Sequence, residues 1–161
     1  MKKITITSQL EVFEKLSDLP ENIQVLIHKA HTACEKAYAP YSHFRVGAAL
    51  LLETGDIITG NNQENASYPS GLCAERVAVY YAGANHPNTT IHAIAITARS
   101  LNKKETKPVP PCGACRQALV EYEVNQKSPM AIYFMGDSGK VYKANSVKDL
   151  LPFVFDSSFL K

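Results

Sequence analysis

The sequence Val46-Gly47-Ala48-Ala49-Leu50-Leu51-Leu52 is a continuous apolar run with the length of a buried strand. The next residues, Glu53-Thr54-Gly55-Asp56, are typical of a turn, and Ile57-Ile58-Thr59 then resumes the strand pattern. Two such runs joined by a short turn that contains glycine predict an antiparallel β-hairpin. This hairpin, with the helices expected on either side of it, decides the fold class.

Helical periodicity precedes the hairpin and follows it. Before it, apolar residues recur at steps of three and four on one face of a predicted helix: Ile23, Leu26, Ile27, Ala30 and Cys34. A polar loop over 60–71 separates the hairpin from a second predicted helix over 73–84. Beyond that helix the pattern predicts a strand over 91–98, a helix over 113–122, and strands over 131–135 and 141–144.

The order of these elements indicates how the sheet is built. Ser146, with Asp149 three residues later, forms a capping box for a short last helix through Leu151. The order is therefore α-β-β-α-β-α-β-β-α, with a hairpin near each end and crossover helices between. We expect an α/β fold of three layers, α/β/α, around a mixed five-stranded sheet.

Residues 1–20 precede this pattern and are expected to form an N-terminal extension to a domain over 21–161. Ile4 and Ile6 alternate like a brief strand, whereas the spacing of the next apolar residues suggests a helical turn: Leu10, Val12, Phe13 and Leu16. A chain of 161 residues with 45% hydrophobic and 20% charged residues can bury the core of one such domain.

Charge and hydropathy argue against two classes of partner. The 17 Lys and Arg exceed the 15 Asp and Glu by only two, and the basic residues are scattered along the chain. A nucleic-acid partner is therefore not expected, because polynucleotide binders usually concentrate basic residues on one face. The sequence has no apolar run near the roughly 20 residues of a membrane-spanning helix and no signal peptide, so we expect a cytoplasmic protein without a membrane partner.

Three of the four cysteines lie in two short motifs, Cys73-Ala74-Glu75-Arg76 and Pro111-Cys112-Gly113-Ala114-Cys115. Each motif stands at the predicted start of a helix, where free backbone N–H groups and the helix dipole favour thiolates. Two converging helix starts would offer Cys73, Cys112 and Cys115 to one zinc ion, leaving its fourth position open as in catalytic sites.

Glu75 and Arg76 indicate that this predicted metal site is catalytic. A carboxylate two residues after a ligand can accept a proton from water at the metal and pass it to a substrate. Arg76 can donate hydrogen bonds to a ligand sulfur and offset the excess negative charge of three thiolates on one divalent cation. A closed structural site would need Cys34 as a fourth ligand, but that residue lies on the apolar stripe of the first helix.

At these residues the sequence resembles cytidine deaminase of the small, homotetrameric, three-cysteine zinc type. The likeness covers about residues 25–155 and also takes in four further segments: Ala39-Pro40-Tyr41-Ser42, Val46-Gly47-Ala48-Ala49-Leu50, Asn62-Gln63-Glu64-Asn65-Ala66 and Leu150-Leu151-Pro152. It implies a cytidine deaminase-like fold with one Zn²⁺ per chain. The implied activity is hydrolysis of a cyclic amidine C–N bond, which converts cytidine and deoxycytidine to uridine and deoxyuridine plus ammonia in pyrimidine salvage.

The resemblance also implies roles for residues outside the metal motifs. Asn62 and Glu64 would hydrogen-bond the ribose hydroxyls, and Phe44 would pack near the pyrimidine. Phe155 would reach the base from a neighbouring subunit, so that active sites are shared within the tetramer. Ala74 is expected beside the base, which its backbone groups would contact. Ala66 and Tyr68 are expected close to the sugar.

Two alternatives stay open at this point. A related deaminase could act on another aminated nucleoside, a nucleoside antibiotic or a base in a polynucleotide, although the last would want a basic channel. A non-catalytic zinc or redox protein could instead be built around Cys112 and Cys115, in which case Glu75 would be dispensable.

Overall fold

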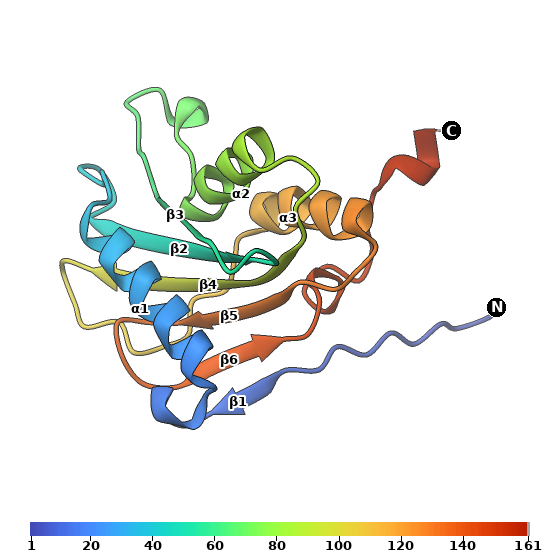
Figure 1. Ribbon diagram of the computed structural model, residues 1–161, viewed down its shortest axis with the longest axis horizontal. Helices are drawn as coiled ribbons and strands as arrows, with labels where there is room; N and C mark the ends of the chain where they lie inside the picture. Colours follow the sequence, from blue (N-terminus) through green and yellow to red (C-terminus); the bar gives the residue numbers. More distant parts are fainter. Residues whose placement is uncertain (161) are drawn as a thin grey trace.

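The computed structural model describes residues 1–160 and places one mixed sheet between two layers of helices (Figure 1). The strands are β1 (Glu11–Phe13), β2 (Phe44–Leu52), β3 (Ile57–Asn61), β4 (Ile91–Ser100), β5 (Ala131–Met135) and β6 (Val141–Ala144). The α-helices are α1 (Glu21–Glu35), α2 (Ala74–Asn85) and α3 (Gly113–Gln126). The predicted three-layer α/β/α fold is confirmed, but its sheet has six strands, in the order β1-β6-β5-β4-β2-β3. Across the described residues, every helix is too short or too polar to cross a bilayer.

Strand β4 shows how the two layers form, because its side chains alternate between two cores. Ala93 and Ala95 face α1, whereas Ile94 and Ile96 face α2 and α3. Residues 93–96 are all buried, as expected of a central strand covered on both faces. The alanines on one face let α1 approach the sheet closely, and the isoleucines fill the core under α2 and α3.

The strand directions bring the starts of α2 and α3 to one edge of the sheet. β2 is antiparallel both to β3, as the hairpin prediction required, and to β4. β3 and β4 therefore run the same way, and their carboxyl ends lie at the same edge of the sheet. Because α2 follows β3 and α3 follows β4, both helices begin near that edge, where ligands bind in open α/β sheets.

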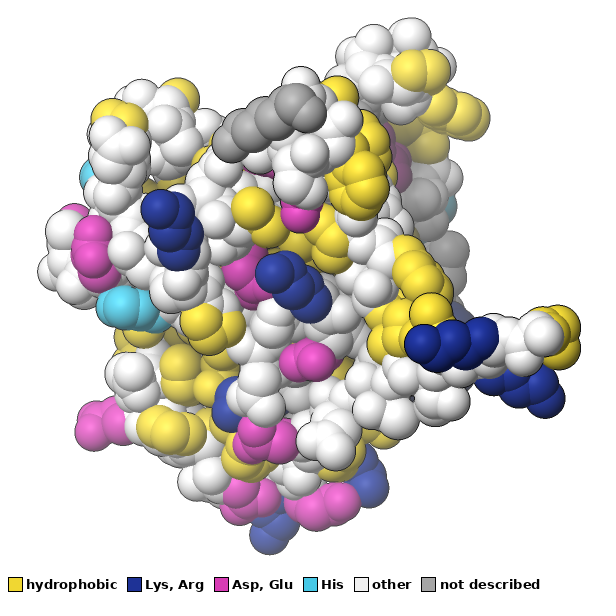
Figure 2. Space-filling view, turned by 90° about the vertical axis from the view of Figure 1, so that its right-hand side faces the viewer, with side chains coloured by type: hydrophobic (Ala, Val, Ile, Leu, Met, Phe, Trp, Pro, Cys, Tyr) yellow, Lys and Arg dark blue, Asp and Glu magenta, His cyan; other side chains and the backbone are white. Residues whose placement is uncertain are grey.

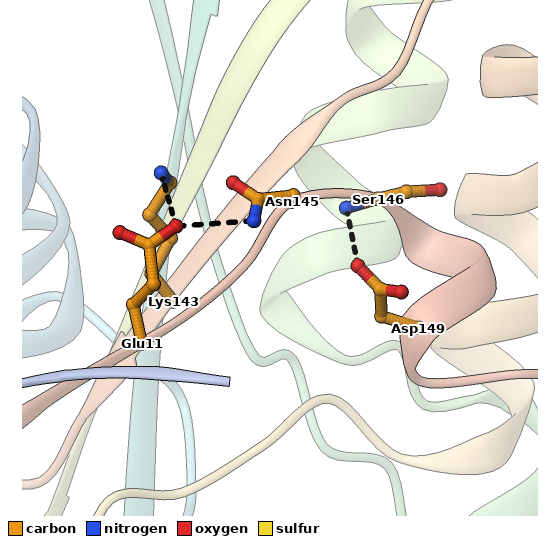
Figure 3. A network of polar contacts seen from close by, with 5 residues as sticks. All are labelled: Glu11, Lys143, Asn145, Ser146 and Asp149. Carbon is orange, nitrogen blue, oxygen red and sulfur yellow. Dashed lines mark hydrogen bonds and ion pairs between the residues drawn. The ribbon is translucent and has the colours of Figure 1, made fainter. Parts of the chain in front are cut away.

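The sixth strand comes from residues 1–20, which the sequence predicted to be an extension. β1 pairs antiparallel with β6, with Glu11 opposite Lys143 and Phe13 opposite Val141. The Glu11 carboxylate accepts hydrogen bonds from Lys143 (2.9 Å) and Asn145 (3.0 Å), which hold the register (Figure 3). The expected helical turn over residues 10–16 is therefore wrong at 11–13, and the expected strand at Ile4 and Ile6 is absent from the described chain.

The pairing of β1 stops where β6 ends. The Ser146 backbone N–H donates to Asp149 (3.2 Å), and the Ser146 hydroxyl accepts from the Lys148 N–H (3.1 Å), so the chain turns into a 3₁₀ helix over Val147–Asp149 (Figure 3). The predicted capping box is confirmed, with the helix ending two residues earlier than expected.

The close approach of α1 to the sheet depends on Gly47. A Cβ at this position would lie 2.0 Å from the Ala30 carbonyl oxygen and 2.5 Å from the Cys34 backbone nitrogen. We predict that Gly47→Ala lowers the free energy of unfolding by at least about 3 kcal/mol, because backbone atoms of a packed helix cannot yield. Urea unfolding followed by circular dichroism measures this. Gly113→Ala is the control, because a Cβ added at Gly113 has no neighbouring atom within 4 Å. Equal stability of the two variants would contradict the packing argument.

Candidate active site

The three cysteines of the two motifs converge at the starts of α2 and α3. Cys73 and Cys112 are the N-cap residues of these helices, and Cys115 lies in the first turn of α3. The sulfur atoms of all three lie within 4.8 Å of one another, with Cys73 and Cys112 Sγ 3.9 Å apart. The fourth cysteine, Cys34, is buried in α1 against the opposite face of the sheet, so it is not part of this group.

The environment of the sulfurs favours a thiolate. The hydrogen bond shared with Cys115, together with the guanidinium of Arg76, lowers the pKa of Cys73 to about 5. The hydrogen bond with Cys73 and burial raise the pKa of Cys115 above the ordinary range. Burial also raises the pKa of Cys34, to about 11. The three convergent soft donors and the adjacent cation fit a zinc ion of the three-ligand type.

Arg76 and Glu75 lie beside the sulfurs on the first turn of α2. Arg76 Nη2 donates to Cys73 Sγ at 3.5 Å, as the charge argument from the sequence anticipated. Its Nε atom is buried and makes no hydrogen bond to residues 1–160. Glu75 is only 4% exposed, and burial raises the pKa of its carboxyl group. A buried carboxyl group beside the three sulfurs is suited to accepting and releasing a proton.

A cleft of about 470 Å³ opens next to Cys73 and Arg76 and includes both residues in its wall. Three of the predicted substrate-binding residues line it, namely Asn62, Glu64 and Tyr68. Phe44, Ala66, Ala74 and Phe155 are not in its wall. Phe44 is half-buried at the start of β2, Ala66 is exposed in the loop after β3, and Ala74 is buried in the first turn of α2. Phe155 is 57% exposed and stacks on Phe159.

Asn62 is held by the start of β2, and Glu64 is held by the segment that precedes this strand. The Asn62 amide accepts from the Val46 N–H (2.8 Å) and donates to the Phe44 carbonyl (2.9 Å). The Glu64 carboxylate accepts from the backbone N–H groups of Tyr41 (2.9 Å) and Ser42 (3.2 Å) and from the Ser42 hydroxyl. These bonds fix both side chains at the cleft before any ligand is bound.

Several residues in the cleft wall were not predicted as site residues: Tyr41, Ser42, Gln63, Asn65, Gly71 and Leu72. Tyr41 packs edge-on against Tyr68, with ring centroids 6.1 Å apart, and the pair forms an exposed aromatic rim. The segment 39–42 carries part of the family resemblance, which is the signal that could have pointed to Tyr41 and Ser42.

Comparison with known proteins defines the class. Residues 20–129 match the family model for the cytidine and deoxycytidylate deaminase zinc-binding region. The cytidine deaminase of Halalkalibacterium halodurans is 42% identical over 132 residues, which cover 82% of this chain and 92% of the relative. That of Sporosarcina psychrophila is 37% identical over 139 residues, covering 86% and 95%. The chain therefore belongs to the cytidine and deoxycytidylate deaminase family.

Solved structures agree with this assignment. The crystal structure of cytidine deaminase from Burkholderia pseudomallei is similar with a TM-score of 0.71 and 41% sequence identity, covering 81% of this chain and 97% of that one. Cytidine deaminase from Mycobacterium tuberculosis gives a TM-score of 0.63 at 33% identity, covering 83% and 96%. Within the family, this chain is similar to cytidine deaminases along most of its length.

The different environments of Cys73 and Cys34 predict different reactivity. In protein stripped of metal by a chelator, iodoacetamide at pH 7 should alkylate Cys73 more than about 100-fold faster than Cys34, because the thiolate is the nucleophile. Peptide mass spectrometry over a time course measures both rates. Added zinc should protect Cys73. Equal rates at the two residues, or no protection by zinc, would contradict the site.

Proposed function

We propose that this protein catalyses the hydrolytic deamination of cytidine and deoxycytidine to uridine and deoxyuridine, with one Zn²⁺ per chain. The observation that carries the proposal is the group of three sulfurs with a buried carboxyl group, Glu75, beside them. The family and the named relatives support the substrate. A non-catalytic zinc or redox role does not explain why Glu75 is buried beside the three sulfurs.

Cys73, Cys112 and Cys115 would hold the metal. A zinc ion held by three protein ligands supplies a Lewis acid that lowers the pKa of water to near neutrality. Arg76, which donates to Cys73 Sγ at 3.5 Å, reduces the negative charge that three thiolates accumulate. The positive ends of α2 and α3 act in the same direction.

Glu75 would move the protons of the reaction. Its carboxylate accepts a proton from the attacking water and delivers it to N3 of the pyrimidine, while the water oxygen forms a bond to C4. Glu75 then accepts the remaining proton from the C4 hydroxyl of the tetrahedral intermediate and passes it to the amino group. The C4–N bond breaks, ammonia leaves and the carbonyl of uridine remains, so that one water is consumed for each ammonia released.

The cleft would select a nucleoside rather than a free base. Asn62 and Glu64 offer amide and carboxylate groups that suit the hydroxyls of a sugar, and both are fixed in place by backbone contacts. The resemblance also assigns contacts with the base or the sugar to Phe44, Ala66, Ala74 and Tyr68, of which Tyr68 lines the cleft. A cytoplasmic pyrimidine-salvage enzyme fits this substrate, and comparing turnover of cytidine with that of single-stranded DNA separates it from a polynucleotide deaminase.

We also propose that the chain works as a homotetramer. Phe155 is not in the wall of its own cleft and lies on a C-terminal segment where Phe153 and Phe159 are also exposed. The termini project from the same side of the molecule, and hydrophobic side chains gather in patches on that side (Figures 1 and 2). Phe155 would reach the cleft of a neighbouring subunit.

Glu75→Gln tests the catalytic assignment. This variant should bind zinc normally but lose turnover of cytidine by a factor of at least about 10², because the amide cannot carry a proton. Loss of absorbance on conversion to uridine gives kcat, and elemental analysis gives the zinc content. Glu121→Gln, on the exposed face of α3, should leave both unchanged. Near-normal turnover by Glu75→Gln would contradict the assignment.

A further inference from the structure

Arg116 makes two hydrogen bonds that connect distant parts of the chain. Its side chain leaves the first turn of α3, and its Nε donates to the Pro111 carbonyl oxygen at 2.9 Å. Its Nη1 donates to the Leu150 carbonyl oxygen at 2.8 Å. One planar guanidinium thus bridges the residue directly before Cys112 and the beginning of the C-terminal segment, although these acceptors are far apart in sequence.

The first of these hydrogen bonds holds the residue before Cys112, the metal-binding cysteine with the least support from secondary structure. β4 ends at Ser100 and α3 begins at Gly113, so Cys112 stands at the end of a connection without helix or strand. Cys112 is the exposed member of the three cysteines. The carbonyl of Pro111 belongs to the peptide unit that joins Pro111 to Cys112, and holding it fixes the backbone from which the Cys112 sulfur projects.

The second bond acts on the segment that carries Phe155. Leu150 and Val154 pack against the core beneath α2 and α3, so this segment lies along α3. The adjacent residue of α3, Gln117, donates from Nε2 to the Phe155 carbonyl oxygen at 2.8 Å. Arg116 and Gln117 therefore anchor the segment at its beginning and at Phe155, and only Arg116 also touches the metal-binding loop.

We propose that Arg116 is a positioning residue that holds Cys112 in its ligating position and ties the metal site to the C-terminal segment. This inference rests on the proposed function, in which the three cysteines hold zinc and Phe155 serves a neighbouring site. Within residues 1–160, Arg116 donates no hydrogen bond to a sulfur, in contrast to Arg76, so its effect passes through the Pro111 carbonyl. Groups that orient metal ligands in this indirect way commonly raise the affinity for the metal by roughly 10- to 100-fold.

The geometry requires arginine. A guanidinium presents several N–H donors in a rigid plane, so it can donate to two carbonyl groups in different directions at once. A lysine ammonium keeps the charge but is a point donor on a flexible stem, and it cannot hold both carbonyls in the same arrangement. Arg116→Lys is therefore the variant that preserves charge while removing the bridge, and Arg116→Met removes both.

The experiment compares zinc release from the intact protein with that from Arg116→Lys, Arg116→Met and Gln117→Met. Holoprotein is mixed with the chromogenic chelator 4-(2-pyridylazo)resorcinol, and the rate of zinc transfer is followed by absorbance. Both Arg116 variants should release zinc about 10- to 100-fold faster than the unchanged protein. Gln117→Met should release it at the unchanged rate, because Gln117 holds only the C-terminal segment.

Steady-state kinetics and thermal unfolding separate positioning from general stability. Gln117→Met should raise KM for cytidine with little change in kcat, whereas the Arg116 variants should change KM and lose zinc. Unchanged zinc release in Arg116→Lys, with or without a lower Tm, would overturn the proposal. If Arg116→Lys does not fold, unchanged release in Arg116→Met would overturn it equally. Absence of zinc from the unchanged protein would instead overturn the proposed function.

Discussion

The convergence of the N-termini of α2 and α3 is the constraint on which the rest of the structure depends. It places Cys73, Cys112 and Cys115 within 4.8 Å of one another although 39 residues separate the first two. It also directs two helix dipoles and a buried carboxyl group toward the same point. Close thiolates repel one another, so the arrangement is stable only with compensating positive charge, which Arg76 provides in part and a divalent cation would complete.

The fold produces this convergence through the direction of its strands. β3 and β4 lie on either side of β2 and run the same way, so each delivers the chain to the same edge of the sheet. Gly47 allows α1 to pack tightly on one face, while the larger side chains of β4 support α2 and α3 on the other. The same edge holds the start of β2, whose backbone fixes Asn62, so the cleft and the metal ligands are positioned by one sheet.

The sequence was sufficient to predict elements whose pattern is local and repeated. The helix period of α1, the apolar run of β2 and the capping box at Ser146 each extend over enough residues to indicate the right structure. β1 could not be predicted in this way, because a strand of three residues has no detectable period and exists through pairing with β6, about 130 residues later in the chain.

The same distinction holds for the site. The cysteine motifs and Arg76 could be located from spacing and charge, because the residues within each motif lie only a few positions apart. The contacts that fix Asn62 and Glu64 depend on the register of β2 and β3 and on the turn at Ser42, which sequence spacing does not specify. The bridge formed by Arg116 depends on where the C-terminal segment packs, and that is determined only by the assembled core.

The most direct test of the account measures metal content and activity on the same sample. Protein purified under reducing conditions should contain one zinc ion per chain by elemental analysis and should convert cytidine to uridine. Removal of the metal by a chelator should abolish that conversion, and added Zn²⁺ should restore it. A preparation free of metal that still deaminated cytidine at the full rate would contradict the account.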